Sequence, residues 1–451
     1  MSRLGSSDMR TAATRAEAVE AGRALRTSVP RRSQAQWPGT ASRTDPLETL
    51  SSEFRTLVSS LVPVRIARMT TSPFGYYRGA AAVMASDLSS IPTSGIEIQI
   101  CGDAHLANFG IFGTPERSLA FDINDFDETA VGSWEWDVKR FMSSVVLAAR
   151  EAGHSDQQAR SAARASGQSY VDEVRRHAES SVLESWYDRL DADVIAASVG
   201  KADRPFARRT VEQARTHTSL DLYPKMTVVG DAGARRIADR PPLISHVDDT
   251  HRDAIATLEH SYRTSLPQER RILLDRFRLM DVARKVVGVG SVGTRCYVAL
   301  LLDDLEAPLF LQIKEARPSV WAREHYGPTQ SINQGKRVVT GQRVMQAAPD
   351  VFLGWTSDSK RDFYVRQLAD MKRAPHLANL SPSRLTDYAA LCARALARGH
   401  ARSGRAAAMI GYIGTSTTFA DAMVTFAFAY ANQTEQDYRR LVEAVNDGHF
   451  V

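Results

Sequence analysis

Two groups of polar side chains follow short apolar segments in the first third of the chain. The first group, Asp103, His105 and Asn108, comes directly after residues 96–100, whose alternating side chains predict a strand. The second group, residues 122–128, ends a predicted β-hairpin and contains several carboxylates. Magnesium takes carboxylate, amide and phosphate oxygens as ligands, and a separate carboxylate can accept the proton of an attacking hydroxyl group. These residues therefore predict a magnesium and phosphoryl-transfer site.

A glycine-rich turn lies much later in the chain. Gly288, Gly290 and Gly293, with Ser291 between them, follow the spacing G-x-G-x-x-G. In dinucleotide-binding proteins a helix follows such a turn at once, but residues 294–302 are β-branched, aromatic and aliphatic and predict a strand. Backbone N–H groups of a turn between two strands can cover the phosphates of ATP. The segment therefore predicts a phosphate-binding turn.

One lysine ends the next apolar segment, residues 308–314. Lys314 would be costly to bury in this predicted strand without an anion nearby. The phosphates of ATP would supply that anion. The alternative is an edge-strand lysine that discourages aggregation.

The first polar group resembles a known catalytic loop. Gly102-Asp103-x-His105-x-x-Asn108 is similar to the HGDxHxxN loop of aminoglycoside phosphotransferases and choline kinases, with Cys101 where those enzymes usually carry histidine. The resemblance implies that Asp103 is the catalytic base and that Asn108 binds the metal. His105 would support the shape of the loop.

The second polar group resembles the strand-end IDFD segment of the same enzymes. This resemblance implies that Asp125 is the other metal ligand. Asp122 is the alternative ligand, because the hairpin is slightly longer than usual, and Asp127 is a supporting residue. The glycine turn and Lys314 are similar to the glycine-rich loop and the strand lysine of protein kinases. ATP and Mg²⁺ are therefore the implied cofactors.

Protein kinases pair that lysine with a glutamate on the following helix. The predicted helix 330–347 contains no acidic residue, so Glu324 or Gln342 is the expected partner. The catalytic loop also precedes the lysine, whereas kinases have the opposite order. The implied fold is α+β and protein-kinase-like with two lobes, circularly permuted, with a helical catalytic lobe and a small β-rich ATP lobe.

Several longer segments resemble the uncharacterised family called domain of unknown function 2252. They are spread over most of the chain: residues 72–80, 101–110, 121–129, 134–140, 341–343 and 397–404. The chain is identified from them as a member of that family. The family implies no substrate, so the expected activity depends on the site residues.

The expected domains follow these motifs. Residues 1–46 form a basic, loosely ordered arm, and residues 47–280 form the catalytic segment. Residues 281–375 form the ATP-binding segment, and residues 376–451 are helices that complete the catalytic lobe. The structure of residues 201–242 stays open.

Four further side chains were considered for a functional role. Arg65, Arg68 and Arg78 precede the catalytic loop and could bind its carboxylates or a phosphate group. Ion pairs on the surface or within the fold are the alternative. His400, in an arginine-rich segment, is expected to be a charge at a helix C-terminus.

Two other functions stay open. Gly102 to His105 also resembles the GDxH motif of metallophosphoesterases, but the chain lacks the further Gly-Asn-His element of those enzymes. A nucleotide-binding pseudokinase or scaffold would explain the missing helix glutamate. In the simplest structural interpretation, the polar residues only cap turns.

Composition limits the class of partner. The chain has 57 basic and 52 acidic residues, and its formal net charge is +5. Arginines in the first 32 residues predict a solvated tail rather than a nucleic-acid surface. Three scattered cysteines predict reduced thiols, and no segment has the roughly 20 apolar residues that span a bilayer. We expect a cytoplasmic protein that binds no nucleic acid and no membrane, with a nucleotide and an unidentified small-molecule or, less favoured, protein acceptor as partners.

Overall fold

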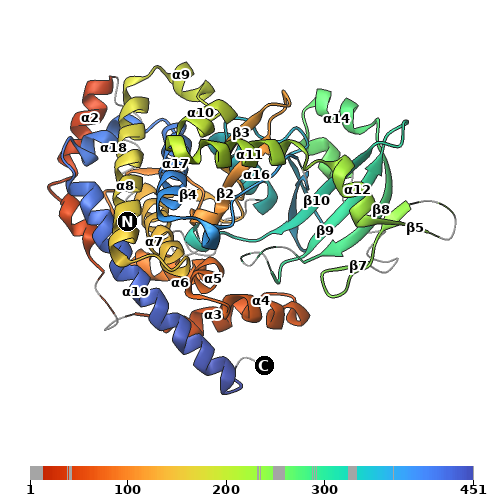
Figure 1. The fold of residues 1–451 in the computed structure, drawn as a ribbon, viewed down its shortest axis with the longest axis horizontal. Helices are drawn as coiled ribbons and strands as arrows, with labels where there is room; N and C mark the ends of the chain where they lie inside the picture. The colour runs from red at the N-terminus through yellow and green to blue at the C-terminus, as the bar shows by residue number, and fades with distance from the viewer. Residues whose placement is uncertain are drawn as a thin grey trace.

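The computed structural model describes residues 14–449 except residues 38, 40–42, 231–232, 234, 247–259, 287, 289, 291, 323–332 and 369. Helices gather on one side of the molecule and a sheet on the other (Figure 1). The expected α+β class is confirmed. None of the described helices is long and apolar enough to cross a membrane.

The β-rich part contains an antiparallel six-stranded sheet in the order β11-β12-β10-β9-β8-β7. Its strands are β7 (Ile244–His246), β8 (Arg278–Lys285), β9 (Cys296–Leu302), β10 (Pro308–Ala316), β11 (Gly354–Ser357) and β12 (Asp362–Gln367). Side chains alternate along β9, so Tyr297 and Leu301 pack in one buried cluster and Val298 and Leu300 in another. The helix α16 (Gln334–Met345) packs on β11 and β12.

The helical part is built on five helices that pack together. They are α7 (Trp134–Glu151), α8 (Asp156–Glu179), α17 (Pro382–Ala401), α18 (Ala406–Ile413) and α19 (Thr418–Asn446). The helix α8 starts at a capping box made by Ser155 and Gln158. Ser381 caps α17, and Pro382 takes the first helical position, where its missing N–H costs nothing.

Small strands join the two parts. The strand β1 (Glu97–Ile100) pairs with β4 (Ala130–Ser133), and β2 (Phe109–Gly113) forms a hairpin with β3 (Leu119–Ile123). The 3₁₀ turn η3 (Leu106–Asn108) precedes β2. These elements place both predicted polar groups at the strand ends that face the β-rich part.

The remaining elements connect or cover these layers. Before β1 they are α2 (Arg15–Ala24), η1 (Arg31–Ala35), α3 (Pro46–Phe54), η2 (Ser59–Leu61), α4 (Val62–Met69), α5 (Pro73–Gly79) and α6 (Ala81–Ser89). After α8 they are α9 (Val182–Tyr187), α10 (Ala192–Ala197), η4 (Lys201–Asp203), α11 (Arg204–Arg215), α12 (Ser219–Met226), β5 (Thr227–Val229), β6 (Arg235–Ile237), α14 (Gln268–Leu274) and η6 (Leu377–Asn379).

The N-terminal arm differs from the sequence expectation. From residue 14 to residue 37 it is not loosely ordered, because α2 packs on α18 and η1 packs on α19. The Arg26 and Arg31 side chains donate hydrogen bonds to the carbonyl oxygens of Tyr412 and Ile413, at 2.9 and 2.8 Å. Those carbonyls belong to the last turn of α18, whose backbone acceptors need partners.

Candidate functional site

A buried carboxylate on α7 holds the backbone at the start of the first polar group. The backbone N–H groups of Cys101 and Gly102 donate hydrogen bonds to the two oxygens of Asp137, at 2.8 and 2.9 Å. His400 also contacts Asp137, at 3.1 Å from its Nε2, and Tyr170 contacts the other ring nitrogen at 2.7 Å. His400 lies in the last turn of α17, as expected, and its ring also forms a buried link between helices.

The backbone of the loop requires glycine at its first position. Gly102 has a φ angle of +77°, which L side chains rarely adopt. A Cβ atom there would also overlap the carbonyl oxygen of Glu128. The Gly102 carbonyl in turn accepts a hydrogen bond from the Trp321 indole N–H. The loop is thus packed tightly against the segment that carries the second polar group.

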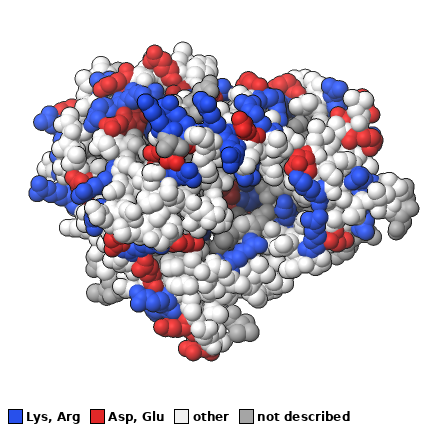
Figure 2. Space-filling model, in the orientation of Figure 1, with Lys and Arg blue, Asp and Glu red and all other residues white. Residues whose placement is uncertain are grey.

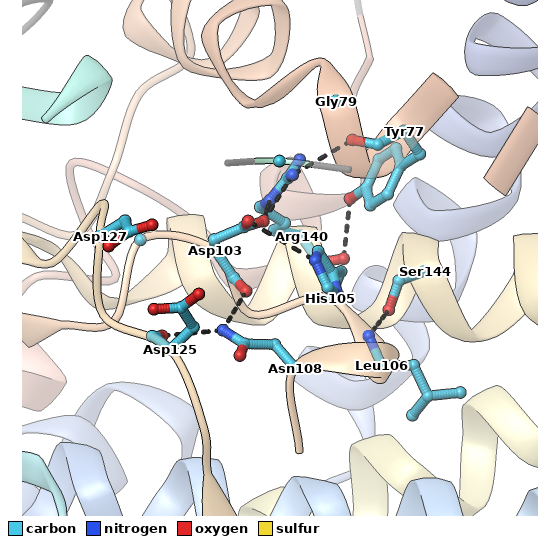
Figure 3. Close-up of polar contacts among 12 residues, drawn as sticks. Tyr77, Gly79, Asp103, His105, Leu106, Asn108, Asp125, Asp127, Arg140 and Ser144 are labelled. Carbon is cyan, nitrogen blue, oxygen red and sulfur yellow. Dashed lines mark hydrogen bonds and ion pairs between the residues drawn. The ribbon is translucent and has the colours of Figure 1, made fainter. Parts of the chain in front are cut away.

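One oxygen of Asp103 is held and the other is not. The Arg140 guanidinium contacts Oδ1 through Nε at 2.7 Å and through a terminal nitrogen at 2.6 Å (Figure 3). The Oδ2 atom lies 3.5 Å from His105 Nε2. Arg140 is fully buried, and the guanidinium also donates to the Tyr77 carbonyl at 3.2 Å. This clamp orients Asp103 so that Oδ2 remains available to a ligand.

His105 is a neutral side chain in this arrangement. Burial lowers the pKa of the imidazole to about 4, so the ring carries no charge near neutral pH. Its Nδ1 atom is buried without a hydrogen-bond partner among the described residues. His105 lines the same cleft as Asp103, as the predicted supporting role requires.

Asn108 joins the two polar groups. Its side-chain Nδ2 donates hydrogen bonds to the backbone carbonyls of Asp103 and Asp125, at 3.0 and 2.9 Å (Figure 3). The amide oxygen accepts no hydrogen bond within the described part of the chain, and the residue lines the cleft. An amide oxygen and a carboxylate, from two residues that line one cleft, are ligand types that suit a hard cation such as Mg²⁺.

The predicted lysine reaches the predicted metal ligand. Lys314 Nζ lies 2.9 Å from Asp125 Oδ2 and 2.6 Å from Asp127 Oδ2. The Tyr364 hydroxyl donates to Asp127 Oδ1 at 2.5 Å and to Asp125 Oδ1 at 3.1 Å. The structure therefore brings together a lysine and two carboxylates that are almost 190 positions apart in the sequence.

Of the two expected partners of Lys314, Gln342 was wrong and Glu324 stays a prediction. Glu324 lies outside the described residues, and Gln342 donates to Gln346 at 2.8 Å instead. The helix α16 contributes Arg337, which donates to the carbonyls of Asp127, at 2.9 Å, and of Thr129. The helix α16 thus holds the backbone at Asp127 and Thr129, and the Asp127 side chain supplies a carboxylate to Lys314.

Opposite charges set the ionisation of this pair. Burial would raise the pKa of the Asp125 carboxyl, but the Lys314 ammonium and the Arg366 guanidinium outweigh burial and hold that pKa well below its usual range. Burial would lower the pKa of Lys314, but Asp125 and Asp127 raise it. Both groups are charged at neutral pH, and a carboxylate in this form is ready to bind a cation.

Asp122 is not at the site. It is buried, and its carboxylate forms an ion pair with the guanidinium of Arg398 from α17. It does not appear among the described residues that line the cleft. The alternative prediction of Asp122 as a metal ligand of this cleft was therefore wrong.

The glycine turn lies over the catalytic loop. Gly288 and Gly290 line the cleft, and the position of a Cβ on Gly290 lies 3.8 Å from Asp103 Oδ2. Arg65 anchors the turn through hydrogen bonds to the carbonyls of Gly290 and Val292, at 2.7 and 3.0 Å. Gly293, with a φ angle of +103°, does not line the cleft but packs on Leu57. Ser291 lies outside the described residues.

The cleft between these elements has a volume of about 300 Å³. Figure 2 shows a hollow on this face between the helical part and the β-rich part, with Lys and Arg side chains around it. Sequence analysis gave no individual role to six polar residues of its lining: Glu53, Asn124, Glu128, Gln312, Arg366 and Lys372. Gln312 could have been found, because it lies two positions before Lys314 and strand side chains alternate.

Comparison with known proteins identifies a family but no activity. The family model described as "Uncharacterized protein conserved in bacteria (DUF2252)" matches residues 55–444. No curated protein and no solved structure matches the chain.

Proposed function

The chain belongs to the DUF2252 family, and for this member we propose ATP- and Mg²⁺-dependent transfer of a phosphoryl group to a hydroxyl acceptor, a small molecule rather than a protein. The observation that carries the proposal is the convergence of three separate motifs on one cleft. Asp103 and Asn108, Asp125, and Lys314 with the glycine turn all line it. Loops that only cap turns have no reason to meet in this way.

Each residue has a role in the proposed reaction. Backbone N–H groups of the turn at Gly288 and Gly290 cover the ATP phosphates, and Lys314 holds them. Asn108 and Asp125 hold Mg²⁺. When bound, the metal neutralises charge on the phosphate oxygens.

Asp103 acts on the acceptor. Its free Oδ2 orients the acceptor hydroxyl and takes the hydroxyl proton as the acceptor oxygen attacks the γ-phosphorus. The bond between that phosphorus and the oxygen bridging it to the β-phosphate breaks, so the products are ADP and a phosphorylated acceptor. Arg140 keeps Asp103 in the position that this attack needs.

The order of elements favours a circularly permuted kinase-like fold. The lysine strand β10 is followed by α16, as the lysine strand of kinases is followed by a helix. The strands β11 and β12 and the helix α17 come next. The catalytic loop and the β2–β3 hairpin come from the N-terminal half, and α17 packs beside them. The proposed ATP lobe is therefore a central segment of the chain.

Two alternatives have weaker support. A non-catalytic nucleotide-binding protein was suggested by the missing helix glutamate, but Asp127 supplies a carboxylate to Lys314 at 2.6 Å. A metallophosphoesterase needs several histidines at its metals, whereas His105 is the only histidine among the described residues of the cleft.

Substitution of Asp103 tests the proposal. We expect Asp103→Asn to lower ATP-dependent phosphorylation of acceptors by at least about 100-fold, because the proton acceptor is lost, while ATP affinity stays within about threefold. The measurement is transfer from γ-labelled ATP to a panel of small alcohols and sugars, with binding followed in parallel. A non-catalytic protein would show no transfer in either form, and equal transfer by both forms would contradict the role of Asp103.

A further inference from the structure

The cleft contains five basic side chains among its described residues, and the protein itself uses three of them. Arg65 holds the glycine turn, Lys314 pairs with Asp125 and Asp127, and Arg366 donates to Gln312 at 3.2 Å and to the Asn124 carbonyl at 2.7 Å. The other two are Arg78 and Lys372. Neither has a hydrogen bond or ion pair within the described part of the chain.

Arg78 lies at the end of the cleft where the chemistry is expected. It belongs to α5, and a Cβ on Gly288 would lie 3.9 Å from one of its terminal nitrogens. The Arg78 backbone carbonyl lies close to Gly290. The guanidinium is therefore under the glycine turn and beside Asp103.

The surroundings of the Arg78 side chain favour binding of an anion. Its Nε atom is buried and has no acceptor among the described residues. Burial lowers the pKa of the side chain, although the negative charge of Asp103 opposes this effect. Asp103 does not pair with Arg78 in the described structure: Arg140 holds Asp103 Oδ1, and no hydrogen bond or ion pair joins Oδ2 to the Arg78 guanidinium. A buried N–H without an acceptor costs free energy, so the arrangement is stabilised when an anion enters.

Lys372 differs in position. Burial, helped by Arg366, lowers its pKa to about 7, and the carboxylates near it are Asp350, Asp125 and Asp370 rather than Asp103. It therefore lies among other carboxylates than Arg78 does. Of the two uncommitted cations, only Arg78 neighbours both the glycine turn and the proposed base.

We propose that Arg78 binds the terminal phosphoryl group of ATP and stabilises its charge during transfer. This inference rests on the proposed function. The planar guanidinium presents several donors in a fixed geometry that suits phosphate oxygens. Arg78 keeps its proton throughout, while the acceptor proton passes to Asp103 and the electron pair of the broken bond stays on ADP.

Comparison of ATP with ADP tests this inference without knowledge of the acceptor. We expect Arg78→Met to weaken Mg²⁺-dependent ATP binding by about 10- to 100-fold and to leave ADP binding within about twofold, because ADP lacks the group that Arg78 contacts. Arg78→Lys should restore part of the ATP affinity. Arg164→Met is the matched control, since Arg164 is exposed on α8 and is not among the described residues that line the cleft.

The outcomes separate the two proposals. Equal losses of ATP and ADP affinity, or no loss of either, would overturn the role of Arg78 and leave the phosphotransferase proposal standing. Failure of the wild-type protein to bind ATP or ADP with Mg²⁺ would overturn both. A denaturation curve without a cooperative transition would show that Arg78→Met is not folded. In that case Arg78→Lys and Arg78→Gln give the same comparison of ATP with ADP affinity.

Discussion

At the scale of single residues, burial and pairing decide which groups of the cleft can act. Asp103 is held through one carboxylate oxygen and Asn108 through its amide nitrogen. Asp103 Oδ2 and the Asn108 amide oxygen therefore stay available to a ligand. Sequence comparison predicted both residues and Lys314, because their types and spacing are specific. It could not predict Arg140 or Asp127 as their partners, since the pairings depend on how α7 and β10 pack.

The charge state of His105 leads to a prediction about pH. In the folded state the pKa of His105 is about 4, whereas an exposed histidine has a pKa near 6.5. Between these values the unfolded chain binds a proton that the folded protein does not, so stability is lost as pH falls through this range. At pH 5 the loss should be about 2 kcal/mol relative to pH 8.

The variant His105→Gln isolates this contribution. Its free energy of unfolding, measured by urea denaturation at pH 8 and pH 5, should fall by about 2 kcal/mol less than that of the wild-type protein. Each protein serves as its own reference, so any constant effect of the substitution cancels. Parallel pH profiles for the two proteins would show that the imidazole titrates normally in the folded state.

At the scale of elements, apolar patterning predicted two strands of the large sheet well. The strands β9 and β10 are continuous apolar segments and were found within two residues of their observed ends. No helix was predicted from the sequence at α5. Ser72 accepts a hydrogen bond from the Gly75 N–H at 3.0 Å and starts a new helix.

The contact between α16 and Thr129, the residue that follows the second polar group, gives a prediction at this scale. A Cβ on Gly341 would overlap the buried Thr129 side chain and lie 2.9 Å from Gln99 Nε2. Thr129 cannot move freely, because its hydroxyl oxygen accepts a hydrogen bond from Gln99 Nε2 at 2.7 Å. Gly341→Ala should therefore cost about 1–3 kcal/mol of unfolding free energy, measured by chemical denaturation.

A second glycine in a helix provides the control. A Cβ on Gly167 of α8 would meet its nearest atoms, in Ala420 and Met142, at 3.4 Å, which is ordinary contact. Gly167→Ala should be neutral or should stabilise the protein by up to about 1 kcal/mol, because alanine favours the helix. Similar destabilisation by both substitutions would mean that the close approach at Gly341 has no special weight.

At the scale of the whole molecule, contacts between distant parts of the chain were beyond sequence analysis. The arm was expected to be loose because it is rich in arginine, serine and alanine. Its arginines instead bind backbone carbonyls of α18 more than 380 positions away. No local pattern identifies such acceptors. Motif order, by contrast, can be read along the chain, and it suggested that the ATP-binding segment is central.

The most direct test of the account is calorimetric binding of ATP with and without Mg²⁺, for the wild-type protein and Asp125→Ala. Asp304→Ala is the control, because Asp304 is an exposed carboxylate without contacts in the described structure. We predict that Mg²⁺ strengthens ATP binding to the wild-type and control proteins. With Mg²⁺ present, Asp125→Ala should bind ATP at least about tenfold more weakly than the wild-type protein does. Absence of ATP binding under both conditions, or binding that neither Mg²⁺ nor the substitution of Asp125 affects, would contradict the proposed phosphotransferase site.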